Sequence, residues 1–214
     1  MKYLLTIVIT AALLLALPAC GNGNGKEDSA ESAVSQTEDK AANEISVVFS
    51  DKEEYTPGAF ELKKTIGFIS GMRYNAESTA KLAYVVLANY DAQLGAYGVE
   101  PPKEAGQIAI VLAFKTDSKV IPFQQQMEEY AKMEVPTGTY QPSWMGEGKS
   151  VQVSYFVGGQ SGGPAMSVDG ASGTATLATS TPEKLSGSID FTSANGSTIK
   201  GTFNVKVEKD LWKE

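Results

Sequence analysis

The residue types that most often carry out chemistry are scarce in this chain of 214 residues, which has no histidine and a single cysteine, Cys20. Without histidine, the Ser-His-Asp and Cys-His nucleophile systems and every histidine-ligated metal site are excluded. One cysteine allows neither an internal disulfide nor a CxxC metal site. Carboxylates therefore remain the only credible catalytic groups, and we expect neither a resident metal nor another cofactor.

Two short strings imitate catalytic motifs. Gly159–Gly163 (GQSGG) has the GxSxG pattern of a nucleophile elbow, but an elbow requires a histidine to take the serine proton. Ser78–Lys81 (STAK) has the SxxK pattern of penicillin-binding enzymes. Those enzymes add SxN and then KTG, whereas here PTG at 136–138 precedes SAN at 193–195 and its lysine is missing. Neither string predicts an enzyme.

Carboxylate chemistry stays open as a less favoured function. A glycosidase requires only two acids, separated by about 5.5 Å or by about 6.5–9.5 Å, but no spacing in this sequence singles out a pair. Asp169-Gly170 and Asp190 are candidates for a calcium site made with loop carbonyls, yet the chain lacks a DxDxDG pattern. Surface charge and turn formation account better for these residues, so we expect the protein not to be an enzyme.

Aromatic residues give the positive indication of a ligand. Tyr140, Trp144 and Tyr155 lie in or beside the loops expected around residues 139 to 156, and flat aromatic faces suit sugar rings. Arg73 adds a planar guanidinium that can anchor a carboxylate. The alternative is that both tyrosines pack in the core, Trp144 covers a strand end and Arg73 forms a surface ion pair. These four residues are the candidate ligand-binding set.

The elements that must position these residues read as strands. Residues 80–90 (AKLAYVVLANY) and 107–115 (QIAIVLAFK) are largely apolar on both faces in their middle, which predicts central strands covered on both sides. Short strands separated by Gly, Ser, Asn and Pro turns are typical of a sandwich or barrel. Further strands are predicted at 46–50, 59–69, 138–141, 151–157, 173–178, 185–192 and 198–207.

One helix and one hairpin complete the expected domain, which runs over residues 45–214. Apolar residues recur at helical spacing in Pro122–Met133, which predicts a short helix capping one open end of the sheets. Its Glu128-Glu129 pair indicates a solvated helix face. Asn195-Gly196 suits a hairpin between the last two strands. The predicted fold is all-β: an antiparallel β-sandwich or barrel-like sandwich with one short helix.

The N-terminus reads as an export signal over residues 1–19. Lys2 supplies a positive charge, and Leu4–Leu17 is an uncharged run of fourteen residues, shorter than the about 20 needed to span a bilayer. The run ends Leu17-Pro18-Ala19-Cys20, which resembles the lipobox of bacterial lipoproteins. The resemblance implies that the signal is removed before Cys20 and that the Cys20 thiol carries diacylglycerol. Cys20 is therefore the expected lipid attachment site, with the membrane as its partner.

Residues 20–44 follow as the lipidated cysteine and a flexible acidic tether. The 24 residues after Cys20 are rich in Gly, Ser, Asn and acids, a composition that buries too little apolar surface to fold; fully stretched they reach about 80 Å. Position 21 is glycine rather than the aspartate that retains Gram-negative lipoproteins in the inner membrane. The resemblance therefore implies the outer membrane if the organism is Gram-negative, and otherwise the outer face of the plasma membrane.

The C-terminal third carries a second resemblance. PTGTYQ at 136–141, SGTATL at 172–177 and LSGSIDFTSANGSTIKGTFNVKV at 185–207 are similar to the closing strands of uncharacterised β-rich lipoproteins of Bacteroidota. The shared elements are turns and strands, so they carry fold information and no catalytic residue.

Charge narrows the choice of partner. The formal net charge is −7 and Arg73 is the only arginine, so we expect no nucleic acid partner. The favoured function is a lipid-anchored cell-envelope protein whose β-domain is a non-catalytic binding or interaction module for a glycan or an envelope protein. The alternative is a lipocalin-like carrier of an apolar ligand, which the doubly apolar strands favour; a carboxylate hydrolase is the less favoured third.

The lipobox resemblance makes a direct prediction. Because the processing and the lipid both depend on the thiol, Cys20→Ser should leave an uncut, unlipidated precursor, detected by intact mass and by membrane fractionation. A Cys20→Ser protein that still matures and fractionates with membranes normally would contradict the lipoprotein interpretation.

Overall fold

The computed structural model describes residues 43–52, 59–75, 78–96, 98–117, 119–122, 125–143, 148–159 and 171–211, with the backbone only at 72–75 and 78–79. The expected signal and Cys20 lie outside these residues. The described helix is α1 (Gln126–Lys132). The described strands are β1 (Glu44–Val48), β2 (Lys64–Asn75), β3 (Ser78–Ala88), β4 (Leu94–Gly95), β5 (Gly98–Val99), β6 (Ile108–Lys115), β7 (Lys119–Val120), β8 (Gly138–Pro142), β9 (Ser150–Val157), β10 (Ser172–Ser180), β11 (Lys184–Thr192) and β12 (Thr198–Asp210).

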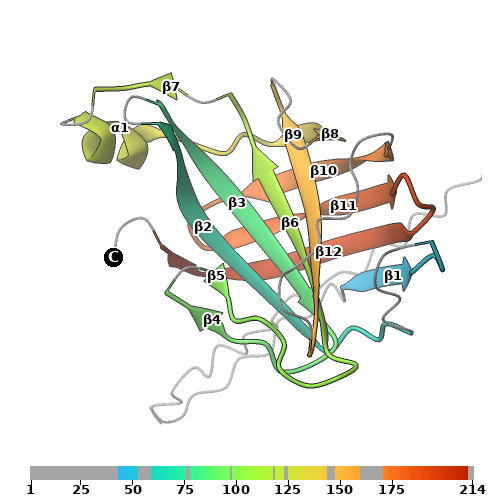
Figure 1. Ribbon diagram of the computed structural model, residues 1–214. Coiled ribbons are helices and arrows are strands. Elements are labelled where there is room, and N and C mark those ends of the chain that lie inside the picture. The colour runs from blue at the N-terminus through green and yellow to red at the C-terminus, as the bar shows by residue number, and fades with distance from the viewer. Residues whose placement is uncertain are drawn as a thin grey trace, which may run out of the picture. The chain divides into compact units, whose positions relative to one another are not determined.

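Eight strands close into a barrel-like sheet in the order β12, β11, β10, β8, β9, β6, β3, β2, and β2 pairs again with β12 (Figure 1). Most neighbours are antiparallel, as expected. The pairings of β8 with β9 and of β12 with β2 are parallel, and they form the two corners at which the sheets meet. The all-β, barrel-like sandwich with one short helix that the sequence predicts is therefore confirmed.

The sheet divides at the β12–β2 corner, because β12 pairs along one edge with two different strands. We call this division the fork. Thr198–Thr202 pair with β1, whereas the last residues of β12 pair with β2. Asn43 fills the fork: its Nδ2 donates to Thr65 Oγ1 at 3.4 Å, and its Oδ1 accepts the Asn204 N–H at 2.7 Å. Gly67 permits the close approach, since a Cβ there would lie 2.7 Å from the Lys206 carbonyl oxygen.

The barrel interior holds one continuous apolar core to which every strand of the ring contributes. Alternation along each strand sends every second side chain inward. Phe114 on β6 is one of these, with its ring 5.2 Å from that of Tyr140 and 5.9 Å from that of Phe203. The buried members are Ile69, Ala83, Val85, Leu87, Ile108, Ile110, Leu112, Phe114, Val135, Tyr140, Val151, Val153, Tyr155, Ala175, Leu177, Leu185, Ile189, Phe191, Ile199, Phe203, Val205 and Val207.

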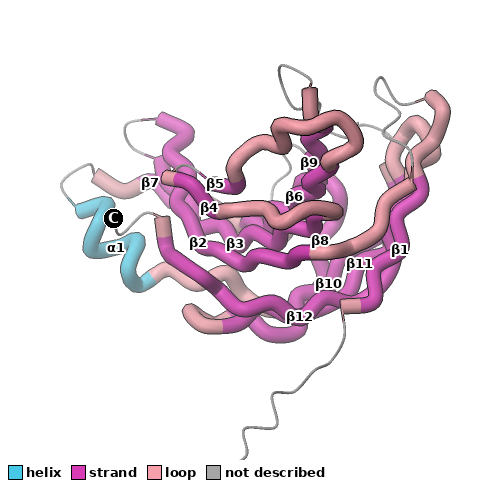
Figure 2. Tube along the Cα trace, turned by 90° about the horizontal axis from the view of Figure 1, so that it is seen from below, coloured by secondary structure: helices cyan, strands magenta, loops and turns pink. Residues whose placement is uncertain are grey.

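A second apolar cluster lies on the outer face of β2, β3 and β6 and explains why β3 and β6 are apolar on both faces. Val86, Ala88 and Ala109 are buried there, and Phe68 stacks on Tyr84 at 4.5 Å between ring centres. The segment carrying the β4–β5 hairpin covers the cluster, with Leu94 and Val99 packed against it (Figure 2). The expectation of central strands covered on both sides is confirmed.

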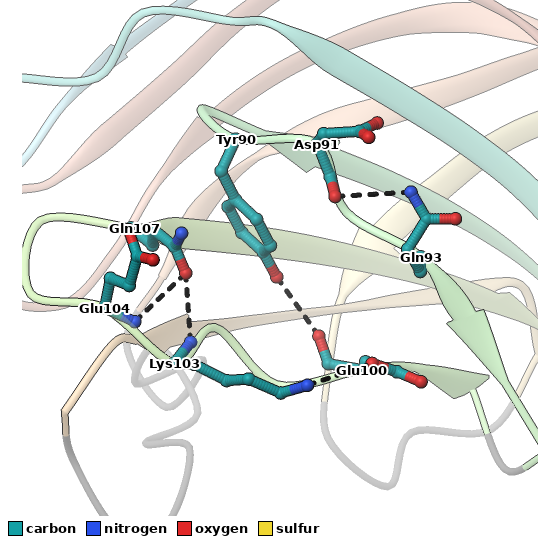
Figure 3. A network of polar contacts seen from close by, with 7 residues as sticks. All are labelled: Tyr90, Asp91, Gln93, Glu100, Lys103, Glu104 and Gln107. Atoms are coloured by element: carbon teal, nitrogen blue, oxygen red, sulfur yellow. Dashed lines mark hydrogen bonds and ion pairs between the residues drawn. The ribbon is translucent and has the colours of Figure 1, made fainter.

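Polar contacts hold this covering segment in place (Figure 3). Gln107 Oε1 accepts the backbone N–H groups of Lys103 and Glu104 at 3.0 and 3.1 Å. The Tyr90 hydroxyl donates to the Glu100 carbonyl at 3.1 Å, and partial burial, followed by the Glu100 charge, raises the Tyr90 pKa. Hydrogen bonds within the covering segment therefore hold it in one conformation over the outer cluster.

Two expected elements differ in extent from the structure. The strand predicted at 59–69 begins only at Lys64 and continues to Asn75, because Phe60 and Leu62 pack against the interior core from outside the strand. The helix predicted at Pro122–Met133 is shorter, Gln126–Lys132. Its Glu128 and Glu129 each form an ion pair with Lys132 at 2.9 Å on the solvated face.

The burial of Phe114 in the interior core can be tested by truncation. Phe114 is fully buried, so Phe114→Ala leaves a cavity between the two sheets and should lower the free energy of unfolding by about 3–5 kcal/mol, measured by urea denaturation. Thr202→Ala, on the exposed face of β12, should change it by no more than about 0.5 kcal/mol. Equal losses in the two variants would contradict the placement of the core.

Candidate functional site

A cavity of about 290 Å³ lies at the end of the barrel beside α1. It is built by five parts of the chain: β2, β3, the end of α1 with the segment after it, the β10–β11 turn and the end of β12. Apolar and charged side chains alternate around it, as is typical of sites that both hold and orient a ligand. The lining residues are Ile69, Lys81, Ala131, Met133, Glu134, Val135, Ser180, Thr181, Pro182 and Asp210.

Lys81 stands where β3 reaches the rim of the barrel. The inward-facing row of β3 continues through Ala83, Val85 and Leu87, all fully buried, so the period of two places Lys81 on the same face at the end of the row. Its Nζ donates to the Met133 carbonyl at 2.9 Å and lies 4.7 Å from the centre of the Tyr130 ring. The strand thus delivers one ammonium group to the cavity wall.

Tyr130 connects the helix to the last strand. Its side chain is fully buried, and its hydroxyl donates to Asp210 Oδ1 at 2.9 Å. Burial above all, and then the hydrogen bond and charge of Asp210, raise the pKa of Tyr130 far above its usual value. The phenol therefore keeps its proton at neutral pH and orients the Asp210 carboxylate at the cavity wall.

A second hollow of about 160 Å³ adjoins the first, since both are lined by Lys81, Met133 and Glu134. The remaining lining residues of this smaller hollow are Thr116, Asp117, Lys119 and Lys132. Asp117 accepts the Gly148 N–H, and Lys132 is held by its two helix glutamates. The Lys81–Met133 hydrogen bond lies in the part that the two hollows share.

Two carboxylates line the larger cavity, Glu134 and Asp210. Glu134 is exposed, and Asp210 accepts the Tyr130 hydroxyl. Within the described residues no group of three or more acidic or cysteine side chains is placed to hold a metal ion. Asp190 forms an ion pair with Lys200 at 2.9 Å instead, and Asp169-Gly170 lies outside the described residues.

The structure places two of the candidate ligand-binding residues in the interior. Tyr140 is fully buried, and its hydroxyl donates to the Pro136 carbonyl. Tyr155 is 1% exposed, with its ring 5.5 Å from that of Phe49. Their strands send both rings inward with Val151 and Val153, so neither offers a flat face to a ligand at the surface. The core alternative for these tyrosines is therefore the correct one.

The side chains of the other candidates lie outside the described residues. Arg73 lies on β2, where its backbone pairs with Thr79; its side chain, Trp144, Ser161 of the GxSxG string and the lipid attachment site Cys20 lie outside the described residues. The SxxK string begins β3, as expected, and is therefore strand rather than the helical turn that the motif requires. Lys81 was not among the residues predicted to bind a ligand. A single lysine among the apolar, inward-facing residues of a strand is the signal that could have identified it.

No helix among the described residues has the length and apolar character needed to cross a bilayer.

Tyr140 has a measurable signature at alkaline pH. Burial raises its pKa to about 12, whereas the unfolded chain ionises near its ordinary value of about 10. The stabilisation due to the neutral phenol is therefore complete below pH 10 and is lost as the pH rises from about 10 to about 12. The stability advantage of the native protein over Tyr140→Phe, measured by urea unfolding at stepped pH, should shrink across that range. An advantage that stays constant to pH 12 would contradict the burial of this hydroxyl.

Comparison of the chain with protein-family models, with curated proteins and with solved structures found no match. Its function must therefore be argued from the geometry of the cavity at the α1 end of the barrel.

Proposed function

We propose that this protein is a lipid-anchored component of the cell envelope whose β-barrel binds a small ligand, or the end of a larger one, in the cavity beside α1. The observation that carries the proposal is the convergence of five separate parts of the chain on one hollow that mixes Ile69, Met133 and Val135 with the charges of Lys81 and Asp210. Apolar walls with a few oriented polar groups are the usual composition of a ligand site.

The size of the cavity limits what it can take. Its volume of about 290 Å³ is at the lower end of ligand sites, roughly 300–1,000 Å³. A terminal sugar of a glycan, the end of a peptide from an envelope protein, or a short amphipathic molecule is of the right scale. The role is non-catalytic binding, and no nucleic acid is involved.

The place of the cavity separates this proposal from a lipocalin-like carrier that holds an apolar ligand in its centre. The barrel fold suits such a carrier, but the ring of Phe114 packs against those of Tyr140 and Phe203 within the described interior. A ligand of this protein therefore binds at the rim, where Lys81 and Asp210 supply polarity, rather than between the sheets.

Anchoring belongs to the same proposal. A lipid on Cys20, followed by the acidic tether expected over residues 20–44, keeps the barrel at the outer membrane of a Gram-negative cell, or on the outer face of the plasma membrane of another. Two or three acyl chains hold firmly, because each buried methylene contributes about 0.8 kcal/mol. The barrel then samples ligands within reach of its own membrane.

Filling the cavity should abolish binding. Ala131 lines the cavity yet is exposed, so Ala131→Trp fills the cavity without disturbing the core. Small fluorinated fragments screened against the full chain by fluorine NMR should include binders whose affinity falls about tenfold or more in this variant. The matched control is Ala105→Trp, in an exposed loop on the outer cover, and it should bind as the native protein does. Fragments that bind the two tryptophan variants equally would refute the site.

A further inference from the structure

The two hollows lie in series along one rim of the barrel. Strand register sets the order: Lys119 on β7 pairs with Thr79 at the start of β3, Lys81 further along β3 pairs with Gly71 of β2, and Asp210 of β12 pairs with Ile69 of β2. Neighbouring strands therefore place the side chains in the sequence Lys119, Lys81, Asp210 around the rim. Both views show β7 and the end of β12 on the same side of the barrel as α1 (Figures 1 and 2).

The two hollows differ in the charged side chains that line them. The smaller hollow is lined by three lysines, Lys81, Lys119 and Lys132, against two acids. The larger cavity is lined by one lysine, Lys81, against two acids, Glu134 and Asp210. Within the described part of the chain, no ion pair engages Lys119, whereas Lys132 is neutralised by its helix partners. Lys119 thus marks the positive end of the rim and Asp210 the negative end.

Between the two ends, the hollows share Met133, flanked by Lys81 and Glu134. Met133 lines both hollows and is 8% exposed, and Ile69 and Val135, 6% and 5% exposed, line the larger one. The Lys81–Met133 hydrogen bond joins β3 to the segment after α1 at this point. A ligand that crosses from one hollow to the other therefore passes the Met133 side chain, with Lys119 at one end of its path and Asp210 at the other.

We infer that the two hollows form one site for a bipolar ligand, which directs an anionic group toward Lys119 and Lys81 and an ammonium group toward Asp210 and Glu134, with an aliphatic stretch against Met133 between them. The inference rests on the proposed function, because it names the chemical class that the same cavity takes. Charge-assisted hydrogen bonds at partly dehydrated groups give such a site its selectivity.

The test uses the full chain and three matched sets of probes, with binding followed by isothermal titration calorimetry. The bipolar probes are aminohexanoate, aminooctanoate and aminododecanoate; the reference probes are the fatty acids and the alkylamines of the same lengths. At least one amino acid of the series should bind about tenfold or more tighter than both of its matched references. Three chain lengths are used so that an unsuitable distance between the two charged groups of one probe does not by itself account for a lack of binding.

Substitutions then assign the two ends. Lys119→Gln should remove the preference for the amino acid over the alkylamine, because it deletes the positive end. Asp210→Asn should remove the preference over the fatty acid. Because Asp210 also accepts the Tyr130 hydroxyl, Glu134→Gln, at an exposed position on the cavity wall, tests the same end independently and should reduce the same preference. Lys52→Gln, at an exposed residue on the segment after β1, is the charge-matched control and should change neither preference.

The outcomes distinguish a failure of the bipolar site from a failure of the proposed function. If no amino acid of the series binds better than its references, or if Lys119→Gln and Lys52→Gln behave alike, the bipolar site is refuted. The rim cavity itself stays supported in that case as long as Ala131→Trp still weakens fragment binding. If Ala131→Trp leaves fragment binding intact, the proposed function fails as well.

Discussion

Closure of the sheet at its two parallel corners is the constraint on which the rest of the structure depends. A sheet with open edges leaves rows of unpaired N–H and C=O groups, and here β12–β2 and β8–β9 satisfy those edges with only a few residue pairs each. The corners bring the two sheets face to face, and the interior core forms only because they do. Gly67 is decisive at one corner, since a side chain there would strike the backbone of β12.

The same closure creates the candidate site. Where β12 ends beside β2, the inward rows run out of apolar residues and reach the rim, so Lys81 and Asp210 emerge there rather than in the core. Helix α1 then supplies Tyr130, which fixes Asp210, and the segment behind it supplies the carbonyl that holds Lys81. Packing of this short helix, and of the segment that follows it, therefore gives the open end of the barrel a lined cavity.

Much of this fold can be predicted from the sequence, and the reason is alternation. Strands as long as β3, β6 and β12 show their period of two plainly, and the Asn195-Gly196 turn joins β11 to β12 as expected. Strands of two residues, such as β4 and β7, have no period to detect. The parallel corners also leave no local mark, because they join segments far apart in the chain.

The site was harder to predict than the fold for a related physical reason. Tyr140 and Tyr155 drew attention as aromatic residues near loops, although Tyr155 shares the inward parity of Val151 and Val153 and so belongs to the core. Lys81 and Asp210 are separated by most of the domain in sequence, and only β2 brings their strands together. The side chains that line the cavity come together only through the closed strand order, which the sequence pattern alone does not show.

The fork at Asn43 has a mechanical consequence. Asn43 is the first described residue and lies directly before β1, so a force applied to the chain from its N-terminal side loads the Asn43 contacts with Thr65 and Asn204 first. Strand β1 lies outside the ring of eight, and β12 still pairs with β2 without it. Under such a force, β1 can separate from β12 while the ring of eight strands stays closed, so the first strand yields before the barrel does.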